Sequence, residues 1–223
     1  MSDSKPTLAI LGGSGDLGGG LAFRWARAGY PIIIGSRSAD KAEQAATELA
    51  AKGVTGKVRG LDNEAAARAG DIVVLTVPFA NQAPTLEAIK AAVQGKILVD
   101  VTVPLVPPRV GTVQLPAGGS AGQIAQAILG EGVRVVSAFQ NVAAAHLEDL
   151  DHDPDCDVLV CGNDAEACTA VLALVAAAGM KGWHAGPIAN SVVAEALTSV
   201  LITLNRRYKI PGAGFRITGT PQA

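Results

Sequence analysis

Residues 13–18 of this chain read Gly-Ser-Gly-Asp-Leu-Gly and are the strongest candidate for chemistry. They match G-x-G-x-x-G and lie between an apolar run at 7–11 and a helical pattern at 17–28. In that context one glycine permits a tight turn, one leaves room for a pyrophosphate, and one lets the helix pack against the strand. Phosphates would then lie at the helix amino terminus, where free N–H groups and the helix dipole favour anions. The candidate residues are Gly13, Ser14, Gly15, Asp16, Leu17 and Gly18. The alternative is a glycine-rich turn without a ligand.

The end of the next apolar run indicates which dinucleotide binds. An acidic residue there would accept hydrogen bonds from the ribose 2′-hydroxyl of NAD. This chain has Ser36 and Arg37 at that place, and Lys41 one helical turn beyond. Arg37 can pair with a 2′-phosphate in a forked geometry, Lys41 adds a point charge, and Ser36 can donate a hydrogen bond. These residues predict NADP; the alternative is a solvated, basic start of a helix.

The remaining candidates give a weaker signal. Val77 and Phe79 end the fourth apolar run, at the edge where open parallel sheets bind ligands. Phe79 could pack against a nicotinamide or anchor its loop. His146 is the one histidine expected near such a cleft, whereas His152 lies in an acidic run read as a solvated loop. No His-Glu-x-x-His motif is present. The lack of evident proton-transfer residues favours direct hydride exchange between two cofactors, which depends on proximity and alignment.

Short apolar runs alternate with helical patterns, as is typical of a parallel sheet covered by helices on both faces. We expect strands at 7–11, 31–35, 56–60, 71–77, 97–101, 133–139, 158–161 and 181–185, with a further strand considered at 214–218. Helices are expected at 17–28, 40–51, 64–69, 85–93, 120–129, 164–178 and 188–207. The predicted fold is a Rossmann-type α/β fold with a doubly wound parallel sheet.

Residues 104–119 interrupt this alternation, because they contain four prolines and end in two glycines. We expect an ordered loop at the edge of a cleft, or a short hairpin. A domain boundary is expected between residues 140 and 155. This gives an NADP-binding domain at 1–145 and a smaller carboxy-terminal α/β domain at 146–223.

The composition excludes several functional classes. The net charge is −2 and no basic block is present, so nucleic acid is not an expected partner. No unbroken apolar run approaches the roughly 20 residues of a membrane span, and the first residues do not resemble a signal peptide. We therefore expect a cytoplasmic protein that does not bind membranes. The three cysteines form no Cys-x-x-Cys pair and are read as reduced thiols in or near the core, rather than as a metal site.

Segments spread over nearly the whole chain resemble the coenzyme F420-dependent NADP reductases. The glycine motif is common to many proteins, whereas Cys161-Gly162-Asn163-Asp164 and Asn205-Arg206-Arg207-Tyr208 are far more specific. The other matching segments are 20–22, 34–37 with 41–42, 135–139, 157–160, 185–187 with 190, 195–198 and 214–219. One departure is Gln140, where some members of the family have histidine.

The resemblance implies an enzyme that transfers a hydride between NADP(H) and the deazaflavin coenzyme F420, with the two rings stacked. It implies no catalytic side chain and no metal. It places residues 14–17 at the phosphates, and Ser36, Arg37 and Lys41 at the 2′-phosphate. Phe79, Ala83, Ala144 and Ala213 would line the nicotinamide or its surroundings, and Val77 and Ala138 are further candidates for cofactor binding. Such enzymes are homo-oligomers, usually dimers. Two alternatives remain: an NADPH-dependent reductase of a flavin or ferric acceptor, and an NADPH-sensing protein without turnover.

Overall fold

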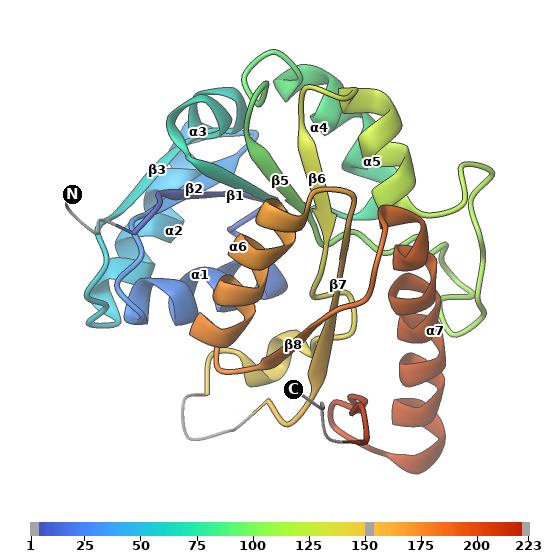
Figure 1. Cartoon of the computed structure of the whole chain (residues 1–223). Coiled ribbons are helices and arrows are strands. Elements are labelled where there is room, and N and C mark those ends of the chain that lie inside the picture. The colour runs from blue at the N-terminus through green and yellow to red at the C-terminus, as the bar shows by residue number, and fades with distance from the viewer. Residues whose placement is uncertain (1–4, 150–153, 220–223) are drawn as a thin grey trace.

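The computed structural model describes residues 5–149 and 154–219 (Figure 1). The strands are β1 Leu8–Leu11, β2 Ile32–Ser36, β3 Val58–Asp62, β4 Ile72–Leu75, β5 Ile97–Asp100, β6 Arg134–Ser137, β7 Asp157–Gly162 and β8 Lys181–His184. The α-helices are α1 Asp16–Arg27, α2 Ala39–Ala51, α3 Asn63–Ala69, α4 Gln82–Ile89, α5 Ala121–Leu129, α6 Ala165–Ala177 and α7 Ser191–Tyr208. Short 3₁₀ helices are η1 Phe79–Asn81, η2 Ala144–His146 and η3 Ile188–Asn190.

The strands form one eight-stranded sheet in the order β3-β2-β1-β4-β5-β6-β7-β8. The first six strands are parallel and change direction of winding between β1 and β4, which is the doubly wound arrangement. β7 runs antiparallel to β6. The prediction of a wholly parallel sheet is therefore wrong at this strand, and the fold is a Rossmann-like α/β fold with a mixed sheet.

The helices cover both faces of the sheet. In Figure 1, α3, α4 and α5 lie above it, and α1, α2 and α6 lie below. Each face has its own apolar cluster, one built around α1, α2 and α6 and the other around α3, α4 and α5. β1, β4 and β5 are buried at every position, because their side chains on both faces point into these clusters.

β7 extends beyond the edge at which the parallel strands end. Its last residues pair with the end of β6, as Ser137 opposite Cys161 and Val136 opposite Gly162. Residues Asp157–Val160 pair only with β8. At about 3.3 Å per residue, these four residues overhang the carboxyl edge of the sheet by roughly 13 Å. The carboxy-terminal part of the chain thus continues the sheet and also builds a wall at its carboxyl edge.

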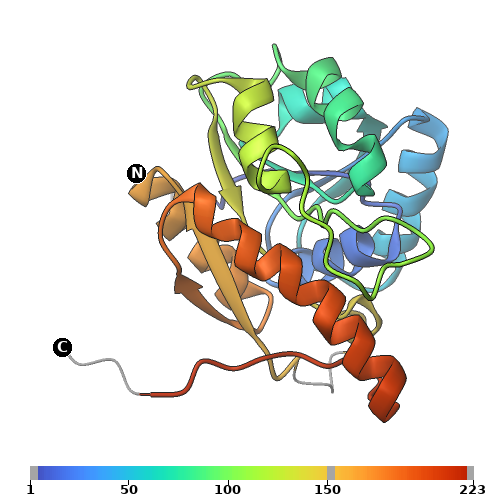
Figure 2. The same cartoon turned by 90° about the vertical axis from the view of Figure 1, so that its right-hand side faces the viewer.

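The segment after α7 does not form the strand considered at 214–218. It runs back past the start of β7 without a ladder (Figure 2). The backbone N–H of Asp157 donates to the carbonyl of Phe215 (2.8 Å), and the Ile217 N–H donates to Oδ2 of Asp157 (2.7 Å). The indole N–H of Trp183 donates to the same oxygen (2.7 Å). Asp157 therefore fastens the tail to the overhanging wall.

Helix α7 lies along the end of the molecule (Figure 2). Within the described residues, Ile188–Tyr208 is the one helical segment long and apolar enough to span a membrane, and 33% of its apolar window is buried. Counting unbroken apolar runs missed this segment, because Glu195 interrupts it. Glu195 is buried against α5, and the Thr198 hydroxyl donates to the carbonyl of Gln140 (3.0 Å). These contacts make α7 part of the folded unit.

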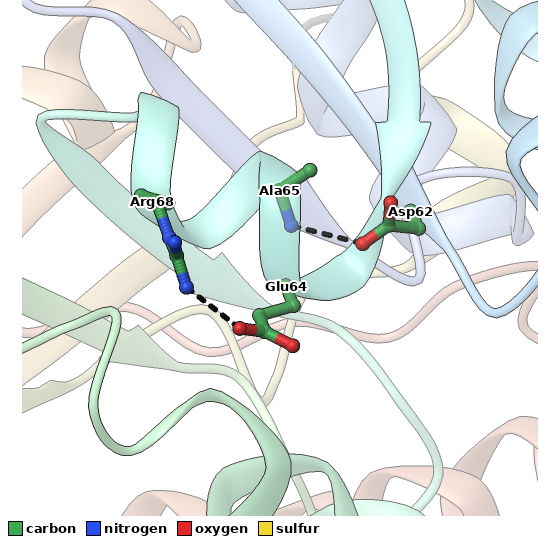
Figure 3. Close-up of polar contacts among 4 residues, drawn as sticks. All are labelled: Asp62, Glu64, Ala65 and Arg68. Atoms are coloured by element: carbon green, nitrogen blue, oxygen red, sulfur yellow. Dashed lines mark hydrogen bonds and ion pairs between the residues drawn. The ribbon is translucent and has the colours of Figure 1, made fainter.

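Side-chain caps explain where several helices begin. Ser120 accepts from the Gln123 N–H at the start of α5 (3.1 Å), as the sequence predicts. Asp62 ends β3 and accepts from the Ala65 N–H (2.9 Å), which fixes the start of α3 (Figure 3). One turn later, Glu64 pairs with Arg68 at 2.7 Å on the exposed face of α3 (Figure 3).

Candidate functional site

The glycine segment forms a tight turn between β1 and α1. The Gly12 N–H donates to the carbonyl of Gly35 on β2 (3.0 Å), and the Gly15 N–H donates back to the carbonyl of Gly12 (2.9 Å). Ser14, Gly15 and Asp16 are exposed, whereas Gly13 and Gly18 are buried. The turn therefore presents its middle residues to solvent at the carboxyl edge of the sheet.

Two glycines of the turn are required by backbone geometry. Gly12 has a φ of +86°, in the left-handed region that residues with a side chain rarely adopt. The motif assigned the tight turn to residues 13–18 and missed Gly12. At Gly18, a Cβ would lie 2.5 Å from Oγ1 of Thr76 and 2.7 Å from the Gly12 carbonyl oxygen. Gly18 thus permits the close approach of α1 to the strands, as the sequence predicts.

The amino terminus of α1 is open to an anion. Its N-cap is Gly15, which has no side chain to accept from the first N–H groups of the helix. A Cβ on Gly15 would meet only the Gly12 carbonyl oxygen, at 3.4 Å, so the space in front of the helix is free. A cleft of about 150 Å³ begins at the turn and continues between α1 and α2, where it is lined by the carboxylates of Asp16, Glu48 and Glu148 and by Lys52. The uncapped backbone N–H groups at the start of α1, and not this acidic cleft, fit a pyrophosphate that approaches the backbone.

The three residues predicted at a 2′-phosphate lie around the end of β2 and the start of α2. Ser36 is half-buried and its hydroxyl accepts from the Ser38 N–H (3.4 Å). Arg37 and Lys41 are exposed. Within residues 5–149 and 154–219, neither cation forms an ion pair with a carboxylate. Two cations at a helix amino terminus oppose the dipole, so an anionic ligand would stabilise this arrangement.

The residues predicted near a nicotinamide come from three separate segments. Val77 and Phe79 are half-buried in the turn that joins β4 to α4, and Ala83 is exposed in the first turn of α4. Ala138 is fully buried after β6, and Ala144 is half-buried in η2. The β4 and β6 segments follow parallel strands and therefore share the carboxyl edge with the glycine turn.

The chain after β6 takes an unusual course. Phe139 has a φ of +72° although it is a fully buried aromatic residue. Such conformations persist where surrounding contacts over-determine them. One such contact is the ring of Trp25 on α1, whose centroid lies 5.6 Å from that of Phe139. Further along the chain, the guanidinium of Arg24 on α1 donates to the backbone carbonyls of His146 (3.0 Å), Leu147 (2.9 Å) and Asp149 (2.9 Å). α1 therefore fixes both the glycine turn and the segment that carries Ala144.

Ala213 lies in the tail after α7, where its N–H donates to Oδ1 of Asn205 (2.7 Å). It lines a small cavity of about 50 Å³ together with Ala143, His146 and Cys156. This cavity does not include the glycine turn, Phe79 or Ala83. The structure thus brings Ala213 beside the segment of Ala144 but does not join it to the β4 turn in one cavity. His146 faces this cavity, and His152 lies outside the described residues.

A buried polar cluster beside the site was not anticipated. Asp100, at the carboxyl end of β5, and Glu195 of α7 are 0% and 2% exposed. Burial raises the pKa of Asp100 to about 6 and that of Glu195 to about 7. Oε2 of Glu195 accepts from the Ala121 N–H (2.6 Å) and Oε1 from the Gly122 N–H (3.1 Å), at the amino terminus of α5. Asp100 lies within the strand predicted at 97–101, one residue before its end, and this acidic residue in an apolar strand was the one available signal.

The cysteines behave as expected for reduced thiols. Cys161 and Cys168 are buried in β7 and α6, and Cys156 is half-buried. Burial raises the pKa of the Cys161 thiol to about 11, which keeps it protonated at neutral pH. The described residues contain no group of three or more His, Cys, Asp or Glu side chains able to hold a metal ion.

Comparison with known proteins assigns the family. Residues 7–104 match a family model described as NADP oxidoreductase, coenzyme F420-dependent. The F420-dependent NADP reductase of Methanocaldococcus jannaschii is 43% identical over 219 residues, covering 95% of this chain and 97% of the relative. The chain belongs to the F420-dependent NADP reductase family. The reductase of Methanothermobacter marburgensis is 38% identical, over 96% of this chain and 99% of the relative.

A solved structure of the same kind has the same fold. It is a protein of Arthrobacter sp. FB24 described as a putative F420-dependent NADP-reductase, with a TM-score of 0.80 and 26% identity. It covers 95% of this chain, and this chain covers 99% of it. For an F420-dependent NADP reductase, the glycine turn and the uncapped start of α1 fit the pyrophosphate of NADP.

Proposed function

We propose that this chain transfers a hydride between NADP(H) and coenzyme F420, with the nicotinamide and deazaflavin rings facing each other at the carboxyl edge of the sheet. The observation that carries the proposal is the open amino terminus of α1, in a chain whose relatives of full length are F420-dependent NADP reductases. When bound, the two cofactors supply the hydride donor and the hydride acceptor. The chain has to bind them, align them and exclude water.

NADP binding is assigned to the first part of the chain. Ser14, Gly15, Asp16 and Leu17 lie at the pyrophosphate. The backbone N–H groups of Asp16 and Leu17 meet it, since the first N–H groups of a helix have no acceptor within it, whereas Gly15, whose N–H bonds to the Gly12 carbonyl, leaves room for it. Gly13 and Gly18 shape the turn around them. Ser36, Arg37 and Lys41 bind the 2′-phosphate. Arg37 and Lys41 are exposed cations that pair with no carboxylate among the described residues, and this supports the assignment.

The nicotinamide is proposed to lie between the β4 turn and the segment after β6. Val77, Phe79 and Ala83 would line one side of it, and Ala138 and Ala144 the other. These residues are mostly apolar, so they can exclude water from the hydride path without supplying a proton donor. The site residues named here include no general acid or base.

F420 is proposed to be held with the help of the carboxy-terminal part, residues 146–223, as a smaller domain beside the NADP-binding domain at 1–145. The overhang of Asp157–Val160 and the tail fastened to it support this proposal, because they add a wall to the carboxyl edge. Ala213 lies in that tail. Gln140 is buried beneath the segment and donates to the Asp100 carbonyl (2.9 Å), so its amide nitrogen is already engaged within the fold.

The test is direct. Purified protein is mixed with F420 and NADPH, and absorbance at the deazaflavin band is followed over time. Loss of that band with NADPH but not with NADH is the expected result. If the protein binds NADPH but the deazaflavin band does not change, the proposal is overturned, and the result favours an NADPH-sensing protein without turnover. Reduction of a flavin or a ferric chelate in its place would identify the other reductase. Equal rates with NADH and NADPH would overturn the assignment of Arg37.

We also propose that the protein acts in the cytoplasm as a homodimer or a higher homo-oligomer. The oligomeric state follows from the resemblance to the family described under the sequence analysis. Light scattering of the purified chain tests the oligomeric state. A measured mass of 22.5 kDa, which is that of one chain, would contradict a homo-oligomer.

A further inference from the structure

Gln82 is the first residue of α4, directly after the turn that leads from β4. It follows η1, which begins at Phe79, and it precedes Ala83. Ala83 and Asn81 are exposed and Phe79 is half-buried, whereas Gln82 is 1% exposed. A buried amide costs free energy unless it is hydrogen-bonded, so a glutamine here needs a specific set of partners.

Those partners lie on two other elements. Nε2 of Gln82 donates to Oδ2 of Asp100 (2.5 Å), at the end of β5, and to the Ala121 carbonyl (2.9 Å), at the start of α5. Both acceptors face the same atom, which sets the orientation of the amide. The bond to the carboxylate of Asp100 is charge-assisted when that group is ionised. One side chain therefore fastens the turn of Phe79 and Ala83 to two neighbouring segments.

The acceptors of Gln82 are themselves held in place. Oδ1 of Asp100 accepts from the Thr102 N–H (2.9 Å). The amino terminus of α5 is held by Glu195, which accepts from the Ala121 and Gly122 N–H groups. The hydrogen bonds that hold the turn therefore form a connected network, which runs from Gln82 to the start of α5 and from there to Glu195 on α7. The side chains of this network are buried.

We propose that Gln82 is a positioning residue for hydride transfer, which holds the Phe79–Ala83 turn at the distance that the nicotinamide requires. The inference rests on the proposed function only in placing the nicotinamide against that turn. A misplacement of about 1 Å at such a site is enough to slow a reaction by on the order of a hundredfold. NADP affinity arises mainly elsewhere, at the start of α1 and at Arg37, so Gln82 should affect kcat more than the KM for NADPH.

The experiment compares Gln82→Met with Gln126→Met. Nε2 of Gln126 also donates to two backbone carbonyls, those of Gly130 (2.8 Å) and Val133 (3.0 Å), but at the far end of α5. Each variant loses two hydrogen bonds of one amide and keeps a side chain of similar length. We expect Gln82→Met to lower kcat for F420 reduction about ten- to a hundredfold, with the KM for NADPH changed less than threefold. Gln126→Met should keep the wild-type kcat.

Two further measurements keep the inference testable. Asp100→Leu removes the oxygen that accepts from Nε2 of Gln82 and should reproduce the loss of kcat, and the double variant should lose no more than either single variant. The emission of bound NADPH, which responds to the surroundings of the nicotinamide, should change in Gln82→Met and not in Gln126→Met. A wild-type protein without F420 reduction overturns the proposed function, and the emission of bound NADPH still tests Gln82. Wild-type kcat and emission in Gln82→Met, or an equal loss in Gln126→Met, overturns the positioning role.

Discussion

The indole ring of Trp25 meets the phenyl ring of Phe139 edge to face, with centroids 5.6 Å apart and an interplanar angle of 80°. Trp25 lies on α1, the helix that begins at the glycine turn, and its indole N–H donates to the Leu174 carbonyl of α6 (2.8 Å). Phe139 is the residue with positive φ after β6. This pair therefore joins the proposed phosphate-binding helix to the segment proposed beside the nicotinamide.

Truncation of Phe139 should destabilise the fold strongly. Phe139→Ala removes a fully buried ring and its contact with Trp25, while Ala keeps the unfavourable positive φ. We expect the free energy of unfolding to fall by about 3–5 kcal/mol in urea titrations. Phe79→Ala, at a half-buried position, is the control and should cost less. Equal losses in the two variants would show that the ring pair contributes little.

Arg37 should determine affinity for NADPH rather than the rate of hydride transfer. Arg37→Ala should raise the KM for NADPH roughly ten- to a hundredfold, as expected for losing a charge-assisted contact of about 1.5–3 kcal/mol. kcat should stay within about twofold, because the 2′-phosphate contact is the same in the ground and transition states. Arg68→Ala, which removes an exposed arginine from α3, is the matched control (Figure 3). A fall in kcat without a rise in KM would contradict the assignment.

Two glycines of the turn should respond differently to the same added methyl group. In Gly15→Ala the new Cβ has room within the protein, so the free energy of unfolding should change by less than about 1 kcal/mol. That methyl group occupies the space assigned to the pyrophosphate, and the Kd for NADPH should rise at least tenfold. Gly18→Ala clashes with Thr76 and the backbone of Gly12, so it should lower stability as well. Fluorescence titration with NADPH and urea unfolding separate the two effects. Unchanged binding by Gly15→Ala would exclude a pyrophosphate at this turn.

Stability should decrease as the pH rises from about 5 to about 8. Burial raises the pKa of Asp100 to about 6 and of Glu195 to about 7, above their values in the unfolded chain. The folded state therefore binds more protons in this range, and its advantage is lost as each carboxyl ionises. Between pH 5 and pH 8 the loss is on the order of 1 kcal/mol from Asp100 and about 2–3 kcal/mol from Glu195, because part of each shift lies below pH 5.

Urea unfolding at pH 5 and pH 8 measures this dependence. Glu195→Gln should flatten it, because the variant cannot ionise at that position. Glu64→Gln, at an exposed carboxylate paired with Arg68, should leave it unchanged (Figure 3). A wild-type protein equally stable at both pH values would show that the two buried carboxyls do not control stability.

Much of the fold could be predicted because local patterns determine it. Buried parallel strands such as Ile72–Leu75 are continuous apolar runs, and Ser120 caps its helix through a contact three residues away. The glycine turn was predicted for the same reason, since its residues act within one short segment. Only the role of Gly12 was missed, because the motif template begins one residue later.

Features that depend on distant segments could not be predicted. The antiparallel direction of β7 leaves no trace in its own residues, since an apolar strand has the same composition in either direction. The segment at 214–218 has the composition of a strand, but it forms no β-ladder. Instead, the backbone N–H of Asp157 bonds to the Phe215 carbonyl, and the carboxylate of Asp157 bonds to the Ile217 N–H. The cluster of Gln82, Asp100 and Glu195 joins residues more than a hundred positions apart.

An open sheet ends in two strands that each expose unpaired N–H and carbonyl groups, and these are templates for aggregation. Here the two edges are β3 and β8. In β3 the Gly60 N–H donates to the carboxylate of Glu43 (3.1 Å), which occupies a group that another strand would need. β8 has four residues, and the ammonium group of Lys181 lies 4.2 Å from the ring centroid of Trp183. Both edges are therefore short and charged, and strand addition between copies is disfavoured at either side of the molecule.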